Sequence, residues 1–548
     1  MLFFNTAGPV NRQDHYCLSP LKRFDLEEME MLFAQKKYFV LHAPRQTGKT
    51  TCMLALADYV NKKGDYKCLY CNVEAAQAAR ENIFTGVRSV LSSLASGALQ
   101  KLKDDFIENH WRKILENNGE LNALELTIGS YAENSDKPVI LIIDEIDSLV
   151  GDTLISILRQ LRSGYEKRPD HFPLSIILCG VRDIQDYRIH SGRDKAIITG
   201  GSAFNIKAKS LRLGDFNKKE TFVLLKQHEK ETGQIIEQNA LESVWKYSQG
   251  QPWLVNALGY EVCFEMKQNR DRKKSITEEM VHQAKENLIL RRETHLDQLG
   301  DKLKEERVRK VVEPILTGSR DLSDLMEDDL QYITDLGLIR RKPVLEVANP
   351  IYREIIPRML TSTTQDSIMQ KSAWYINPDN TLDMHKLIKA FQEFFREHSE
   401  HWLERFQYKE AGPQLLLQAF LQRIINSGGR VEREYGLGRK RVDILVLWSG
   451  KTGDSESDEK NKDQGKNSHK RGQLQQTQKT VVELKILYKS LEKTIAEGIE
   501  QTADYMDISN SNEGHLIIFN RNENTSWDEK IFVKKESFNG KEIVVWGM

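Results

Sequence analysis

A short segment, residues 43–50, has the residue types and the spacing of a loop that binds nucleotide phosphates. Its sequence APRQTGKT follows the apolar run of residues 38–41, which predicts a strand, a phosphate loop and the first turn of a helix. In such a loop, backbone N–H groups surround the phosphates, Lys49 contacts the β and γ oxygens, and the Thr50 hydroxyl binds Mg²⁺. We therefore expect ATP and Mg²⁺ here. The expected contacts are Pro44, Arg45, Gln46, Thr47, Gly48, Lys49, Thr50 and Thr51.

Ala43 stands where this loop pattern has its first glycine. A methyl group is tolerated at that position only if the backbone does not need a positive φ. We therefore expect a negative φ at Ala43.

Residues 138–145, with the sequence PVILIIDE, supply the acidic partner that a phosphate loop requires. Five consecutive apolar residues rich in Ile predict a central parallel strand that is covered on both faces. Asp144 is expected to hold the Mg²⁺ shell, and Glu145 to orient and deprotonate the attacking water. Because the two motifs agree in order and chemistry, nucleotide binding and hydrolysis are favoured over a chance loop beside an ordinary core strand.

A second group of acids lies near the C-terminus, inside two apolar segments that predict strands. Asp443 lies in residues 442–447, and Glu483 and Lys485 lie in residues 480–486. Side chains two residues apart on a strand share a face, so pairing of the two strands would bring all three together. The two carboxylates can then bind one divalent ion, Mg²⁺ or Mn²⁺, while the lysine faces an attacking water. Burying these charges is costly without such compensation, which favours a function.

This arrangement resembles the PD-(D/E)XK nuclease superfamily, with Asp443 as the D and Glu483-x-Lys485 as the E-x-K. Val442 replaces the proline of the namesake motif. Gln501 and Tyr505 lie four residues apart on an expected helix and are similar to the Q-x-x-x-Y element of some branches. The resemblance implies an α/β restriction-endonuclease-like fold and metal-dependent cleavage of phosphodiester bonds. DNA is the favoured substrate and RNA the alternative.

Upstream acids could complete that metal site. Glu410 precedes an apolar helical pattern and is similar to the extra acid that other members of the superfamily place there. Glu434 is a weaker candidate, because it can equally neutralise Arg433 or Arg439.

The elements that position the phosphate loop alternate between apolar strands and amphipathic helices, which predicts a parallel sheet. A strand over residues 173–180 brings Arg182 to its carboxyl end, where ligands bind in open α/β sheets. Arg182 is therefore a candidate sensor of the γ-phosphate, and an ion pair with Asp183 or Asp186 is the alternative. Residues 204–208 predict the edge strand.

From residue 216 to about residue 292 the pattern becomes helical, with a break at residues 248–253 that ends one helix and begins another. Gly250-Gln251-Pro252 is similar to the G-x-P turn in the lid of AAA+ or signalling-type (STAND) ATPases. Together with the phosphate loop and Asp144-Glu145, it gives residues 10–295 a resemblance to that class. The resemblance implies a P-loop ATPase with a helical lid, in which Pro252 lies near the nucleotide.

Residues 296–360 resemble the winged helix that archaeal-type members of that class carry after the lid. The helix that would enter a DNA groove is acidic, and its carboxylates would be repelled by phosphates. We therefore favour a packing or regulatory module, with DNA contact through the basic wing of residues 340–343 as the alternative. The acids are Glu327, Asp328, Asp329 and Asp335.

The balanced charge composition of the chain excludes a strong overall electrostatic field. Among 548 residues, 79 Lys and Arg balance 80 Asp and Glu, so contact with nucleic acid must be local. The longest apolar run is residues 139–143 and the N-terminus has no signal pattern, which predicts a cytoplasmic protein without membrane contact. Cys68 and Cys71 lie in a predicted strand and are expected to be a packed, reduced pair rather than zinc ligands.

The expected organisation is multidomain α/β, because the chain is too long for one core. We predict an ATPase whose ATP turnover is coupled to a nuclease, acting in DNA processing or in defence against foreign DNA. The alternative is a nucleotide-dependent switch whose last domain only binds; a homo-oligomer is left open. The expected parts are an ATPase core (1–215), a lid (216–295), a winged helix (296–360), a linker (361–385) and a nuclease-like domain (386–548) with a disordered insertion (449–479).

Overall fold

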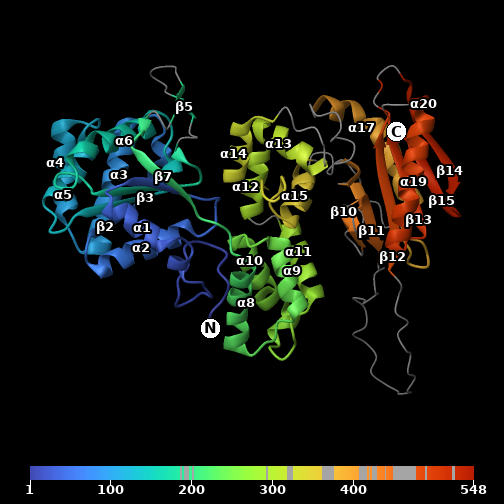
Figure 1. The fold of residues 1–548 in the computed structure, drawn as a ribbon, viewed down its shortest axis with the longest axis horizontal. Helices are drawn as coiled ribbons and strands as arrows, with labels where there is room; N and C mark the ends of the chain where they lie inside the picture. The colour runs from blue at the N-terminus through green and yellow to red at the C-terminus, as the bar shows by residue number, and fades with distance from the viewer. Residues whose placement is uncertain are drawn as a thin grey trace, which may run out of the picture. The chain divides into compact units, whose positions relative to one another are not determined.

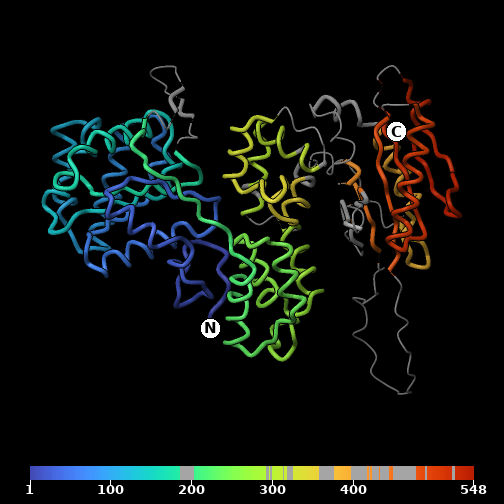
Figure 2. Tube along the Cα trace, in the orientation of Figure 1, coloured from blue at the N-terminus to red at the C-terminus, as the bar shows by residue number. Residues whose placement is uncertain are grey.

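The computed structural model divides the chain into two compact units. The first unit comprises Met1–Val312 and Ser323–Arg353, and the second comprises Glu313–Leu322 and Glu354–Met548. Figure 1 labels their helices and strands, and Figure 2 traces the chain through them. The structure describes residues 1–184, 188–190, 197–199, 203–291, 294–317, 325–360, 375–405, 416–418, 420–421, 429–437, 440–448, 477–487, 490–520, 522 and 525–548.

A parallel five-stranded sheet in the order β2-β3-β4-β1-β7 organises the first unit. β4 lies between β1, which leads into the phosphate loop, and β3, which ends at Asp144. The edge strand expected at residues 204–208 begins later, because Ala203 and Phe204 are buried in the core and pairing with β1 starts at Lys207. The strands are β1 (Tyr38–His42), β2 (Lys67–Asn72), β3 (Val139–Asp144), β4 (Ser175–Gly180) and β7 (Lys207–Arg212).

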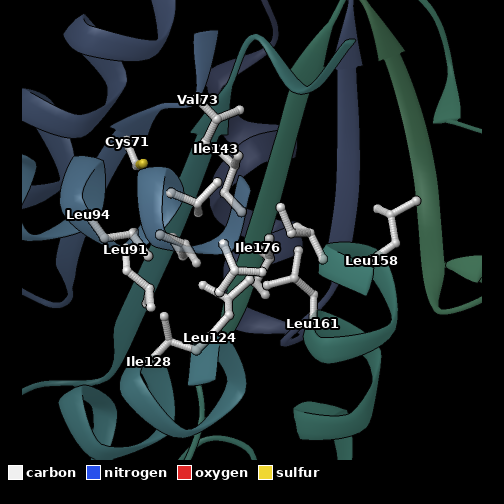
Figure 3. Packing of buried hydrophobic residues seen from close by; sticks show 14 of the residues in the cluster. Cys71, Val73, Leu91, Leu94, Leu124, Ile128, Ile143, Leu158, Leu161 and Ile176 are labelled. Carbon is white, nitrogen blue, oxygen red and sulfur yellow. The ribbon is translucent and has the colours of Figure 1, made fainter. Parts of the chain in front are cut away.

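Helices cover both faces of this sheet, as the continuous apolar pattern of β3 predicts. Figure 3 shows the larger core, where α3 (Ile83–Gly97), α5 (Ala123–Glu133) and α6 (Gly151–Ser163) pack on β2, β3 and β4. α1 (Leu26–Ala34) and α2 (Lys49–Lys63) pack on the opposite face. Residue 68 lies in one core and residue 71 in the other, so these two free cysteines cannot share a zinc ion.

The lid contains α8 (Lys218–Thr232), α9 (Gln238–Ser248), α10 (Pro252–Tyr260) and α11 (Glu278–Arg291). The predicted break at residues 248–253 is confirmed. The Gln251 side chain accepts a hydrogen bond of 2.6 Å from the Leu254 N–H and so caps α10, and Pro252 occupies the first turn, where a missing N–H costs nothing.

After the lid come three helices, a two-stranded hairpin and a closing helix. α14 ends before Gly337, and Asn349 caps the closing helix by accepting a hydrogen bond from the Tyr352 N–H. The elements are α12 (Thr294–Leu303), α13 (Glu306–Thr317), α14 (Glu327–Asp335), β8 (Ile339–Arg340), β9 (Glu346–Val347) and α15 (Pro350–Leu360).

A mixed six-stranded sheet in the order β10-β11-β12-β13-β15-β14 forms the second unit. α17 (Met384–Arg405) packs on one face, and α19 (Leu491–Ser509) packs on the other. The side chains of the central strands alternate between these two cores, as strand geometry requires. The strands are β10 (Gly429–Leu437), β11 (Lys440–Trp448), β12 (Gln478–Ile486), β13 (Glu513–Phe519), β14 (Phe532–Phe538) and β15 (Lys541–Gly547).

Two expected boundaries in this unit were wrong. Tyr375 and Leu382, placed in the linker, are buried in the core beside α17. β12 begins at Gln478, inside the expected insertion, because the Gln478 side chain bonds the backbone of Leu382 in both directions. The remainder of the insertion, residues 449–476, and residues 361–374 of the linker lie outside the described residues. In the described part of the chain, no helix is both long and apolar enough to cross a membrane.

Candidate functional site

The phosphate loop has the geometry that its sequence predicts. Gly48 has a φ of +89° and caps the N-terminus of α2, a conformation that a side chain would strain. Ala43 is fully buried and does not have a positive φ, which satisfies the condition set by its methyl group. The loop therefore aims the N-terminus of α2, with its unpaired N–H groups, at the position of an anion.

Lys49 lies across this loop, 5% exposed. Its Nζ donates to the carbonyl oxygens of Ala43 at 2.9 Å and Pro44 at 3.0 Å. No carboxylate of the described residues forms an ion pair with it. A buried cation whose hydrogen-bond partners are neutral carbonyls is costly, so the site favours an anionic ligand.

Asp144 and Glu145 lie at the carboxyl end of β3, as expected. Asp144 is fully buried, and its Oδ2 accepts a hydrogen bond of 2.8 Å from the Tyr70 hydroxyl. Glu145 has a φ of +60°, an uncommon conformation for a residue with a side chain. Burial and the nearby Asp147 carboxylate raise the pKa of Glu145, while Lys49 lowers it. A carboxyl with a raised pKa is suited to proton transfer.

Beside the loop lies a pocket of about 720 Å³, measured with its solvent-open part, which we call the loop–lid pocket. The phosphate loop contributes Gln46, Thr47, Gly48 and Thr51, and the lid contributes Pro252, Trp253 and Asn256. The N-terminal residues close it, and Figure 2 shows this blue segment beside the green lid. The Trp253 indole donates to the Thr6 carbonyl at 2.9 Å. Pro252 thus lies where the sequence predicts, beside the loop.

Arg182 lies elsewhere. It lines a second pocket together with Pro44 and Arg45, and its guanidinium lies 5.0 Å from the centre of the Tyr332 ring. Asp183, its expected ion-pair partner, bonds Lys207 at 2.6 Å. The role of Arg182 as a phosphate sensor stays a prediction.

The predicted carboxylates of the second unit come together on one face of its sheet. β11 pairs antiparallel with β12, and the register that joins Ile444 to Val482 brings Asp443 beside Glu483. Leu445 and Val481 pack toward α19, so alternation turns Asp443, Glu483 and Lys485 toward that helix too. The expected juxtaposition is confirmed.

A chain of hydrogen bonds joins these residues to α19. The Lys485 ammonium donates to Glu483 Oε1 and to Gln501 Oε1, each at 2.8 Å. Gln501 Nε2 donates to the Tyr505 hydroxyl at 2.8 Å. Asp443 Oδ2 accepts from the Leu484 N–H at 2.9 Å. All five predicted side chains therefore form one connected polar site.

The electrostatics of this site favour a cation. Burial and the neighbouring Asp443 carboxylate raise the pKa of Glu483 to about 8, although Lys485 lowers it. Glu483 is 1% exposed, and its Oε2 has no hydrogen-bond partner among the described residues. Burial lowers the pKa of Lys485, but the neighbouring Glu483 and Asp443 carboxylates and Tyr505 together raise it above its usual value, which keeps the ammonium protonated.

Two carboxylates with an unpaired buried oxygen fit the donor set that Mg²⁺ or Mn²⁺ prefers. Within the described ranges, no group of three or more His, Cys, Asp or Glu side chains is placed to hold a metal. Glu410 lies outside the described residues, and nothing is described of the Glu434 side chain. Asp443 and Glu483 are thus the two predicted metal-binding carboxylates that the structure brings together.

A family model for the AAA-like domain matches residues 22–354, which is more than half of the chain. The chain belongs to this AAA-like family. The matched part has the parallel-sheet α/β fold of a P-loop ATPase, and the expected resemblance is confirmed at that level. No curated protein matches the chain.

Among solved structures, a Walker-type ATPase of Pyrococcus abyssi has a TM-score of 0.44 at 13% identity and covers 64% of this chain and 99% of its own. Cdc6p of Pyrobaculum aerophilum has a TM-score of 0.33 at 16% identity, covering 63% and 94%. The RuvB Holliday junction branch migration motor of Thermotoga maritima has a TM-score of 0.30 at 14% identity, and the match covers 61% of this chain and 95% of that one. These scores are low, so membership rests on the sequence match.

In the AAA-like domain, the C-terminal end of α14 and the turn after it pack inward, while Glu327 and Asp328 at its start are exposed. A Cβ added at Gly337, in the turn after α14, would lie 2.7 Å from Pro44 Cγ, so this turn touches the phosphate loop. Asp335 is fully buried 3.8 Å from the His42 ring, and Arg212 donates to the Thr334 carbonyl. This face of α14 cannot enter a DNA groove in this conformation.

The basic wing is engaged as well. Arg340 pairs with Glu346 at 2.9 Å and donates to Gln249 of the lid at 2.6 Å. Arg341 forms a bidentate pair with Glu327, with distances of 2.5 and 2.9 Å. Both guanidinium groups of the wing therefore have partners within the AAA-like domain.

Sequence reasoning missed three contributors to the AAA-like site. Tyr70 bonds Asp144 from the neighbouring strand. Arg23 donates to the Thr47 carbonyl at 3.2 Å and lies 4.5 Å from the centre of the Phe216 ring, which ties the loop to the lid. Asn256 lines the loop–lid pocket. None of the three residues belongs to a motif. Only Tyr70 could have been suspected from the sequence, because it lies in a predicted strand close to the strand of Asp144.

We predict that Asp443→Asn stabilises the metal-free protein by about 1 kcal/mol, because it removes a negative charge beside Glu483 and keeps an acceptor for the Leu484 N–H. Denaturant unfolding of the full chain in EDTA measures this change. Glu536→Gln, which neutralises an exposed carboxylate on β14, is the control. Lower stability of Asp443→Asn than of this control would contradict the proposed repulsion.

Proposed function

We propose that this chain binds and hydrolyses ATP in its AAA-like domain and cleaves nucleic acid, favouring DNA, in its C-terminal domain. The observation that carries the second part is the buried Glu483 beside Asp443, with an unpaired oxygen at Glu483 and a protonated lysine next to it. Such a site on a nuclease-like sheet fits DNA processing or defence against foreign DNA.

For ATP, the α2 N-terminus and Lys49 would hold the phosphates, and Thr50 with Asp144 would hold Mg²⁺. Glu145 would accept a proton from the attacking water, a role that its raised pKa favours. The hydrogen bond from Tyr70 orients the Asp144 carboxylate.

For cleavage, Asp443 and Glu483 would hold Mg²⁺ or Mn²⁺. The bound metal supplies a water of lowered pKa and offsets charge on the leaving oxygen. Lys485 donates hydrogen bonds and remains protonated, so it orients the water or stabilises charge rather than accepting a proton. Gln501 positions Lys485, and Tyr505 fixes the Gln501 amide.

A nucleotide-dependent switch is the second candidate, and the docked α14 favours it. Because Gly337, in the turn that follows α14, touches Pro44 of the phosphate loop, a change of the loop on nucleotide binding would act directly on this turn and through it on α14. In that case the C-terminal domain would only bind nucleic acid or a partner protein.

Glu145→Gln is expected to bind ATP normally and to lower turnover about a hundredfold, because the amide cannot accept the proton. Lys49→Ala should instead lose ATP binding, since the buried cation is removed. Calorimetric titration and phosphate release distinguish the two effects, and Lys62→Ala, an exposed lysine on the same helix, is the control. Unchanged turnover in Glu145→Gln would remove that residue from catalysis.

With Mg²⁺ or Mn²⁺, the full chain is expected to cut plasmid, linear or single-stranded DNA, and Glu483→Ala should lower the rate about a hundredfold by removing a metal ligand. Gel assays with and without ATP, and with RNA as a second substrate, measure the rate. Glu500→Ala removes an exposed acid of α19 and is the control. Intact substrates with wild-type protein, or equal cleavage by Glu483→Ala, would refute the nuclease and leave the switch.

A further inference from the structure

One residue that lines the loop–lid pocket carries a buried polar atom without a hydrogen-bond partner among the described residues. Asn256 on α10 lines this pocket and is 8% exposed. Its Nδ2 donates to the Pro252 carbonyl at 2.8 Å. A carbonyl only accepts, so the group that faces Pro252 must be the NH₂, and Oδ1 is the oxygen on the other side. This Oδ1 has no hydrogen-bond partner among the described residues.

Neighbouring polar groups of the pocket are already paired. The Tyr16 hydroxyl contacts Glu231 and the His228 ring. The Cys17 backbone exchanges two hydrogen bonds of 3.0 Å with the Gln227 side chain. These groups hold the N-terminal segment against the lid, so they are not available to read a ligand.

The pocket walls suit a flat aromatic ring. Apolar side chains come from three separate parts of the chain, and the phosphate loop lies at the same pocket. A base stacked between such walls would be held without regard to its identity, so selection requires a polar contact. The apolar lining residues are Val10, Leu18, Pro20, Phe216, Leu224 and Trp253.

We infer that Asn256 Oδ1 accepts a hydrogen bond from the exocyclic amine of adenine and thereby selects ATP over GTP. A buried acceptor left unpaired costs free energy, and a base with an amine at its edge satisfies it. Guanine carries a carbonyl at the corresponding position, so two acceptors would face each other. This inference rests on the proposed nucleotide binding and makes Asn256 a specificity residue, not a catalytic one.

Affinities of the full-length wild-type protein for three nucleotides test this role without any variant. Purine riboside triphosphate lacks only the amine of ATP, so it should bind about three- to tenfold more weakly, the size of one neutral hydrogen bond. GTP should bind more weakly still. Calorimetric titration measures the three dissociation constants. Equal affinities for ATP and the purine analogue would overturn the inference.

Asn256→Leu keeps the size of the side chain and removes the acceptor. It should bind the purine analogue as wild type does and lose the preference for ATP, so that the ratio of the two affinities approaches one. Retained affinity for the analogue shows that the variant is folded. Asn239→Leu, an exposed asparagine on α9, should keep the wild-type ratio. A wild-type ratio in Asn256→Leu would also overturn the inference.

The same measurements distinguish a failure of the proposed ATP site from a failure of the role of Asn256. If wild-type protein bound neither nucleotide, or bound them equally well with Lys49→Ala, the proposed ATP site would be wrong. If binding required Lys49 but ignored the amine, only the role of Asn256 would fail.

Discussion

Buried ionisable groups with incomplete pairing organise both sites of this protein. Lys49 is 5% exposed and is held by two backbone carbonyls. Glu483 is 1% exposed beside Asp443, with one oxygen unpaired. Taking such charges out of water costs several kcal/mol, which a packed core does not recover. Under the proposed function, an anion would complete the first site and a cation the second, and each fold would bear the cost until its ligand binds.

In each sheet, the geometry of the strands determines where the charged side chains lie. In the AAA-like domain, parallel strands bring the phosphate loop and Asp144 to the same edge, separated by β4. In the second unit, antiparallel pairing and period-two alternation place three charges on the face covered by α19. Both chemistries therefore depend on central strands, where backbone pairing limits movement.

Residues with a local pattern were predictable, and residues placed by long-range packing were not. The phosphate loop, Asp144 and the Asp443, Glu483 and Lys485 group follow from strand periodicity and motif spacing. Asn256 joins the site only because a segment some 250 residues earlier packs on the lid, a contact without a local signal. Arg182 follows a predicted strand, yet Tyr332 of α14 lies beside it, and packing between distant elements decided its surroundings.

The central claim is that an anion binds beside Lys49 and a cation binds beside Asp443 and Glu483. Hydrogen exchange of the full chain, measured by mass spectrometry with each ligand added alone, tests this claim most directly. ATP with EDTA should slow exchange in the phosphate loop and the start of α2, and leave β11 and β12 unchanged. Mn²⁺ without nucleotide should slow exchange in β11, β12 and α19, and leave the loop unchanged. If Mn²⁺ alone protected nothing around Asp443 and Glu483, or ATP nothing around Lys49, the account would be contradicted.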